Sequence, residues 1–203
     1  MSGIPPRRKE SGEQRRSAIL NAARRVFALK GYANTVVEDI AVEAGIGKGT
    51  VYLYFPSKEQ VYLAALLEDA RTLDCESRRA MTEARTWQEA LRAYVEVRLR
   101  YFDQHQDFLR IYMTEFRGMC MQGKPVSADL YRLAEAGEAQ IAQIFAAAAA
   151  RGEMRDVDPE LAALTVSDLT RGLMERRLRT WGRTVGQADA EFAVEMMCRA
   201  LER

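Results

Sequence analysis

The chain has 203 residues, which is enough for one large domain or for a small domain joined to a larger one. With 48% hydrophobic residues and a net charge of only +1 it can bury a sizeable core, yet no apolar run approaches the ~20 residues of a membrane-spanning helix. The N-terminus lacks the apolar segment of a secretory signal, and three widely separated cysteines argue against a disulfide framework or a zinc site. We therefore expect a cytoplasmic protein without membrane contacts, bound metal or cofactor.

The first segment of the chain, residues 1–12, is predicted to be a flexible basic arm, because its composition cannot build a core. It belongs to a basic first third of the protein. Residues 1–60 hold ten Lys and Arg against six Asp and Glu, a net of +4, whereas residues 61–203 hold twenty against twenty-three, a net of −3. This distribution favours a polyanion-binding N-terminal part joined to a body with another role.

Helix signals repeat along the rest of the chain, and no strand pattern competes with them. In the first helical segment, apolar residues recur at a spacing of three to four and stop at Gly31, which suits the residue after a helix. Thr35 with Glu38, and Thr86 with Glu89, are predicted to form capping boxes at further helix starts. We therefore predict an all-α fold of about nine helices, which cover roughly residues 13–30, 35–44, 47–55, 57–80, 86–103, 107–119, 127–151, 158–179 and 189–203.

The first three helices contain a predicted helix-turn-helix unit at about residues 35–55. On a helix over residues 47–55, Val51 and Phe55 point inward. The outward face combines a cation, a missing side chain, an apolar group and several hydroxyls, which is unusual for a solvated helix and suits a DNA groove. Gly49 would let the backbone approach base edges, at a cost of about 1 kcal/mol in helix propensity. The predicted DNA-binding residues are Thr35, Gly47, Lys48, Gly49, Thr50, Tyr52, Leu53, Tyr54 and Lys58.

Each of these residue types has a partner on DNA. Lys48 can donate to guanine O6 or N7, and Leu53 can cover a thymine methyl group. The helix starts at Thr35 and Gly47 offer backbone N–H groups to phosphates. A nucleotide-binding loop is excluded, because Gly47 and Lys48 are followed by Gly49 where a P-loop requires Ser or Thr. The remaining hydroxyl and ammonium groups can donate to phosphate oxygens; they belong to Thr50, Tyr52, Tyr54 and Lys58.

Residues 35–66, TVVEDIAVEAGIGKGTVYLYFPSKEQVYLAAL, resemble the N-terminal DNA-binding domain of the TetR family of bacterial repressors. The resemblance covers about residues 13–72, and it implies that the residues matching Lys48, Thr50, Tyr52, Tyr54 and Lys58 contact DNA. Two departures are Ile46, where valine is usual, and Gly47, where serine often caps the recognition helix. The matching positions are Thr35, Asp39-Ile-Ala41, Ala44-Gly-Ile46, Gly49-Thr-Val-Tyr52, Tyr54-Phe55 and Ser57-Lys-Glu59.

The resemblance implies a DNA-binding domain at residues 13–72 and a C-terminal domain at residues 73–203 that binds an effector and dimerises. It also implies a ligand-responsive repressor that binds a palindromic operator in double-stranded DNA as a homodimer and is released by a small, mostly apolar effector. An architectural or partition-type DNA-binding protein without an effector stays open as the alternative. An enzyme is not expected, because a single histidine and the lack of a Ser-His-Asp spacing leave little catalytic machinery.

Two ionisable residues, Arg98 and Glu115, interrupt apolar faces of the fifth and sixth predicted helices. Leaving such a charge unpaired costs several kcal/mol, so it is usually paired or lines a cavity. Pairing of the two residues with each other, or exposure to solvent, stays open beside a ligand pocket, in which Arg98 would favour an anion and Glu115 a cation. The candidate effector site comprises Trp87, Tyr94, Arg98, Phe102, Phe108, Tyr112, Glu115 and Phe116.

The last two predicted helices carry broad apolar stripes. Core burial within one chain would explain either stripe alone, whereas two such terminal helices favour a two-fold four-helix interface. The predicted dimer residues are Val166, Leu169, Gly172, Leu173, Phe192, Met196, Met197 and Leu201.

Overall fold

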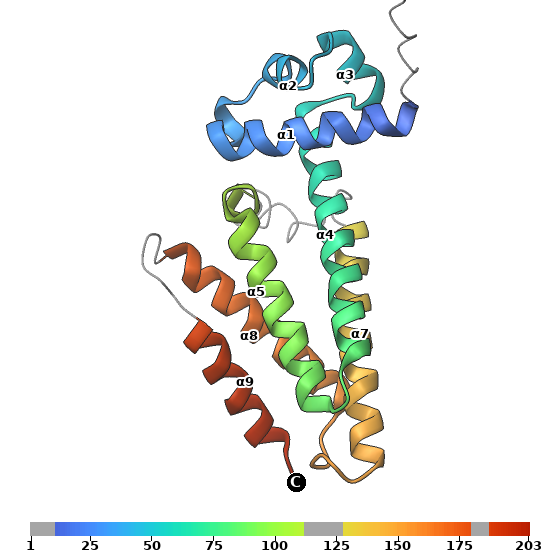
Figure 1. Cartoon of the computed structure of the whole chain (residues 1–203), viewed down its shortest axis with the longest axis vertical. Coiled ribbons are helices and arrows are strands. Elements are labelled where there is room, and N and C mark those ends of the chain that lie inside the picture. Colours follow the sequence, from blue (N-terminus) through green and yellow to red (C-terminus); the bar gives the residue numbers. More distant parts are fainter. Residues whose placement is uncertain (1–10, 112–127, 180–186) are drawn as a thin grey trace, which may run out of the picture. The chain divides into compact units, whose positions relative to one another are not determined.

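The computed structural model describes residues 11–111, 128–179 and 187–203, and it is all-α, as predicted. The described residues form eight helices and no strand; one isolated bridge joins Met154 to Glu202 (Figure 1). The chain divides into two compact units, Met1–Leu66 and Leu67–Arg203, and the division lies within the helix that spans Lys58–Glu83. None of the described helices is long and apolar enough to cross a membrane. Most of the sixth predicted helix, residues 107–119, lies outside the described residues.

The first unit contains three helices and the beginning of a fourth: α1 (Gly12–Asn34), α2 (Val37–Glu43), α3 (Lys48–Tyr54) and α4 (Lys58–Glu83). α2 packs on both α1 and α3 (Figure 1). The apolar stripe predicted for the first helix is buried, which confirms its direction; it consists of Ile19, Ala22, Ala23, Val26 and Phe27.

Two glycines with positive φ set the path of the chain around α2. Gly31 interrupts the end of α1 with φ 75° and ψ 169°, a conformation that is essentially restricted to glycine. Gly45 has φ 65° and lies in the turn between α2 and α3. The sequence predicted both interruptions, and the helix-turn-helix unit therefore has the predicted order.

The predicted capping box at Thr35 is wrong. Thr35 is fully buried, and its hydroxyl donates to the Gly31 carbonyl at 2.7 Å instead of capping α2. The N-cap residue is Val36, whose N–H donates to the Asp39 carboxylate at 3.1 Å. The reciprocal half of the box therefore exists, but one residue further along, with Asp39 in the place that the sequence assigned to Glu38.

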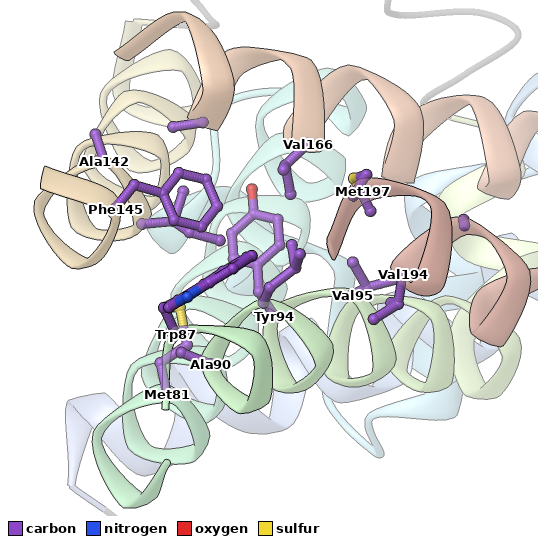
Figure 2. Close-up of a cluster of buried hydrophobic side chains, with 14 of the residues drawn as sticks. Met81, Trp87, Ala90, Tyr94, Val95, Ala142, Phe145, Val166, Val194 and Met197 are labelled. Carbon is purple, nitrogen blue, oxygen red and sulfur yellow. The ribbon is translucent and has the colours of Figure 1, made fainter. Parts of the chain in front are cut away.

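The second unit contains the rest of α4 together with α5 (Trp87–Ile111), α7 (Ala128–Ala150), α8 (Pro159–Arg179) and α9 (Gln187–Leu201). α5 contacts α7, α8 and α9, so it lies at the centre of this unit. Its core is built around aromatic rings: Trp87 meets Phe145 edge to face at 6.1 Å, and the Tyr94 hydroxyl points between Phe145 and Val166 (Figure 2).

Most helix limits in the second unit are those that the sequence predicts. The Thr86 hydroxyl accepts the Glu89 N–H at 3.1 Å, and the Asp158 carboxylate accepts the Glu160 N–H at 2.9 Å, so both starts are capped as predicted. The fifth helix differs, because it continues to Ile111 across a single non-helical residue, His105.

Candidate functional site

α3 presents the surface that the sequence predicts for DNA. Val51 is fully buried and points into the core of the first unit. On the opposite side Leu53 is 84% exposed and Tyr52 is 44% exposed, beside the exposed residues Lys48 and Gly49. We call these four outward residues the α3 face. An ammonium, a phenol and an isobutyl group thus share one open surface, while the flanking Thr50 and Tyr54 are half-buried and Gly47 is exposed at the N-cap.

Packing does not explain the glycine in the middle of α3. A Cβ atom at Gly49 would meet no other atom within 4 Å, and the backbone there does not have a positive φ. Because glycine costs about 1 kcal/mol relative to alanine inside a helix, its presence points to a partner that approaches the backbone closely. A base edge in the major groove is such a partner.

We expect Gly49→Ala to change stability and DNA binding in opposite directions. The free energy of unfolding should rise by up to about 1 kcal/mol from the gain in helix propensity. Binding to the operator should weaken by about 1–3 kcal/mol, since the added methyl group separates the helix from the bases. Urea unfolding and gel-shift titration at one salt concentration measure the two effects. Unchanged operator affinity would remove Gly49 from the contact surface.

Lys48 has a protein partner in the free chain. Its ammonium lies 3.2 Å from the carboxylate of Glu38 in the first turn of α2, and both side chains are about half exposed, at 49% and 59%. An exposed ion pair of this kind contributes about 0–1 kcal/mol. The pair is therefore easily exchanged for a base or a phosphate, but Lys48 is not an isolated charge. Sequence reasoning missed Glu38 because the contact bridges two helices.

The neighbouring carboxylate, Asp39, has a structural role. It accepts hydrogen bonds from the Lys30 ammonium at 2.6 Å and from the Val36 N–H at 3.1 Å. These two donors hold the pKa of Asp39 below its ordinary value. Asp39 therefore stays ionised near neutral pH and ties the start of α2 to α1.

Lys58 is engaged within the first unit. Its ammonium donates to the carbonyl oxygens of Tyr32 at 2.8 Å and Thr35 at 2.9 Å, and it lies 4.4 Å from the centre of the Tyr32 ring. One of its three N–H groups is left for a phosphate. Lys58 thus holds the connection between α1 and α2, a role that the sequence did not indicate.

Thr35, by contrast, is removed from the predicted set of DNA contacts. Its residue surface is fully buried, and its backbone N–H donates to the Tyr32 carbonyl at 3.3 Å. Both of its donors are therefore used within the protein.

In the second unit, Arg98 brings three helices together. Its guanidinium donates to the Ser77 hydroxyl of α4 at 2.8 Å and lies 3.5 Å from the centre of the Tyr94 ring of α5. On α7, a Cβ atom at Gly137 would come within 2.8 Å of Nη2. Burial lowers the pKa of Arg98, since desolvation disfavours its charged form. Arg98 and Tyr94 belong to the predicted effector residues, whereas Ser77 and Gly137 do not.

The other predicted effector residues have different outcomes. Trp87 and Phe102 are buried, at 2% and 1% exposure, and Trp87 belongs to the aromatic core of the second unit. The indole N–H of Trp87 has no hydrogen-bond partner within the described parts of the chain. Four predicted positions lie outside the described residues, Phe108 by its side chain only; they are Phe108, Tyr112, Glu115 and Phe116.

The two units correspond to two known family models. Residues 19–65 match a model described as bacterial regulatory proteins, tetR family. Residues 84–199, more than half of the chain, match a model described as tetracyclin repressor-like, C-terminal domain. The chain belongs to the TetR family. It is therefore a DNA-binding transcriptional regulator with a helix-turn-helix.

Individual TetR family proteins resemble the chain to different extents. The HTH-type transcriptional regulator YerO of Bacillus subtilis strain 168 is 31% identical over 105 residues, which span 50% of this chain and 36% of that relative. The crystal structure of PfmR from Thermus thermophilus is 26% identical, covers 91% of this chain and 99% of its own, and has a TM-score of 0.71. FadR from Bacillus subtilis, solved in complex with stearoyl-CoA, shares the fold at 20% identity with a TM-score of 0.75, over 90% of this chain and 97% of its own.

In this TetR family protein, some of the predicted dimer residues point inward to the core of the second unit and the others are exposed. Val166 and Met197 are corrections: they are 1% and 6% exposed and pack into the core of their own unit. Each helix has apolar residues on two sides, so the sequence pattern alone does not separate its inward residues from its outward ones. Three further predicted residues are partly buried against the same core, namely Leu169, Leu173 and Leu201.

Apolar side chains are also exposed on α8 and α9. Phe192 and Met196 on α9 are 69% and 47% exposed, and Gly172 on α8 is also exposed. Leu161 and Leu164 of α8, which are not among the predicted dimer residues, are 61% and 44% exposed. We call Leu161, Leu164, Phe192 and Met196 the α8–α9 apolar surface. Single exposed apolar residues are ordinary in proteins, whereas larger contiguous apolar patches mark interaction sites.

Proposed function

We propose that this protein is a transcriptional repressor that binds a palindromic operator as a homodimer and leaves it when a small, mostly apolar effector binds the second unit. The observation that carries the proposal is the α3 face, where Gly49 and Leu53 are open without a packing reason. A solvated helix gains nothing from these two residues. A helix that enters a major groove gains a close backbone approach from one and a contact with a thymine methyl group from the other. Because its target is DNA, we expect the protein to act in the cytoplasm.

The α8–α9 apolar surface supports the homodimer. A two-fold interface uses the same patch on both chains, and two adjacent helices from each chain then form a four-helix contact. A dimer that carries two helix-turn-helix units reads two half-sites about 34–36 Å apart, which is one turn of DNA. The operator is therefore expected to be an inverted repeat.

Two observations support an apolar effector. The second unit has a large aromatic core around α5, with Trp87, Tyr94 and Phe145 in contact (Figure 2). A protein of the same fold, FadR of Bacillus subtilis, was solved in complex with stearoyl-CoA. The architectural alternative lacks such support, because it assigns no role to Arg98, the cationic side chain that contacts Ser77 and Tyr94 in this unit.

The test is selection of binding sites from random duplex DNA with the purified full-length chain, followed by footprinting. We expect an enriched inverted repeat and an even number of chains on each site. DNA binding without any enriched sequence, over a range of salt concentrations, would favour the architectural alternative.

Lys48 should decide which sequence is enriched. We expect Lys48→Ala to reduce the difference in binding free energy between operator and random DNA by about 1–3 kcal/mol, because a base-edge contact carries sequence information. Tyr52→Ala is the matched control on the same helix, since the loss of a phosphate contact should weaken operator binding and random-DNA binding about equally. Gel-shift titrations at fixed salt give both ratios. An unchanged ratio for Lys48→Ala would assign base reading to other residues.

A further inference from the structure

The charge of Arg98 has no counter-ion among the described residues. Arg98 belongs to no ion pair among these residues; its one hydrogen bond goes to the neutral hydroxyl of Ser77, and its guanidinium lies over the Tyr94 ring. Asp74 and Glu138 act on Arg98 only over a longer distance, and the Asp74 carboxylate already binds Arg78 at 2.9 and 3.2 Å. Arg98 is partly buried, and charged side chains in such positions are normally paired, so its guanidinium is available to an anion.

The surroundings of Arg98 show that its position is built into the fold. Gly137 lies in the interior of α7, where alanine would be the better helix former, and alanine would bring a methyl group to 2.8 Å from the guanidinium. The Tyr94 ring supports the guanidinium from the other helix, at 3.5 Å. Three helices thus hold the group in place, which preorganises it for a ligand.

Ser77 adds a second donor to the same place. It is 1% exposed, and its hydroxyl oxygen accepts the hydrogen bond from Arg98. Its own hydrogen has no acceptor among the described residues. Arg98 and Ser77 therefore offer N–H groups and one O–H group that can donate to a bound acceptor.

We propose that the effector carries a carboxylate group, which binds to the guanidinium of Arg98 and the hydroxyl of Ser77, and that its apolar body extends along the aromatic side of α5. One guanidinium and one hydroxyl match the single charge and the two oxygens of a carboxylate, and the planar fork of arginine binds both oxygens at once. The apolar body follows from Tyr94 and its neighbours in the core. This inference rests on the proposed effector-controlled function and gives that effector a chemical class.

The experiment measures binding of straight-chain monocarboxylates, from hexanoate to octadecanoate, and of the uncharged primary amide of each, to the full-length protein by calorimetry. We expect at least one carboxylate to bind at least about tenfold more tightly than its amide, since hydrogen bonds to a charged group are stronger than neutral ones. In Arg98→Met this preference should fall to within about twofold. Arg92→Met is the control, because Arg92 lies on the same helix and pairs with Glu96 at 3.6 Å on the surface.

Gly137→Ala tests the position of the charge without removing it. The added methyl group must displace the guanidinium, so carboxylate binding should weaken about tenfold while the thermal midpoint is unchanged or higher. This variant also replaces Arg98→Met if that protein does not fold. Equal binding of carboxylates and amides by the wild type, or full carboxylate binding by both variants, would reduce Arg98 to a structural tie between α4, α5 and α7.

Gel shifts without a ligand and with a saturating carboxylate separate this inference from the proposed function. If the wild type binds its operator but prefers no carboxylate, the carboxylate site is wrong and the DNA-binding function stands. If a carboxylate binds through Arg98 but leaves the operator complex intact, the site stands and the proposed release mechanism is wrong.

Discussion

Phe192→Asp is expected to convert the protein into a monomer and to weaken operator binding by at least about 100-fold, because one chain then binds one half-site without the gain from simultaneous binding of the second. Phe192 is the most exposed side chain of the α8–α9 apolar surface, at 69% exposure. A carboxylate in its place would have to be desolvated against a second copy of the same apolar patch, and it would face the partner's carboxylate across the two-fold axis. Sedimentation at a concentration where the wild type is dimeric gives the mass directly.

The control for this prediction is Tyr131→Asp. Tyr131 is also an exposed aromatic residue, at 42% exposure, but it lies on α7 and outside the α8–α9 apolar surface. This variant should stay dimeric and keep its operator affinity. A dimeric Phe192→Asp protein would instead place the contact between chains elsewhere.

Lys58→Met should destabilise the first unit by about 2–3 kcal/mol, beyond any loss of DNA affinity. The ammonium is bound to two carbonyl oxygens, those of Tyr32 and Thr35, and it lies over the Tyr32 ring. Methionine fills a similar volume but donates no hydrogen bond, so both carbonyl groups lose a charged partner. Urea unfolding at one protein concentration, monitored by the circular dichroism of the helices, measures the change in the free energy of unfolding.

Lys30→Met is the matched control for Lys58→Met. Lys30 is 43% exposed and pairs with Asp39 at the surface, so we expect a loss of less than about 1 kcal/mol. If Lys58→Met were as stable as the wild type and only bound DNA more weakly, the phosphate contact would be the main role of Lys58.

Local patterns in the sequence were sufficient for the helices and for the direction of their faces. The α1 stripe, the inward Val51 and the breaks at Gly31 and Gly45 all depend on residues a few positions apart. The same range explains the failure at Thr35. Its spacing to Glu38 fits a capping box, but the glycine conformation at Gly31 frees a carbonyl that binds the Thr35 hydroxyl instead.

Contacts between distant segments could not be predicted in this way. Lys58 binds carbonyl groups 26 and 23 residues earlier in the chain, and Arg98 meets Ser77 and Gly137 from two other helices. One of these contacts did leave a signal. A glycine inside an otherwise alanine-rich helix, such as Gly137, costs helix stability and therefore indicates close approach by another group.

The ion pair between Lys48 and Glu38 also bears on how fast an operator is found. Glu38 places a negative charge beside the α3 face, which partly cancels the attraction of Lys48 for DNA, and Lys48 must leave Glu38 before it contacts a base. Random sequences offer Lys48 a phosphate at most, whereas an operator offers a base edge as well. We expect Glu38 to shorten the time that the protein remains on incorrect sites and to leave more molecules free to sample the rest of a bacterial chromosome. A more basic α3 face would hold DNA more tightly and search it more slowly.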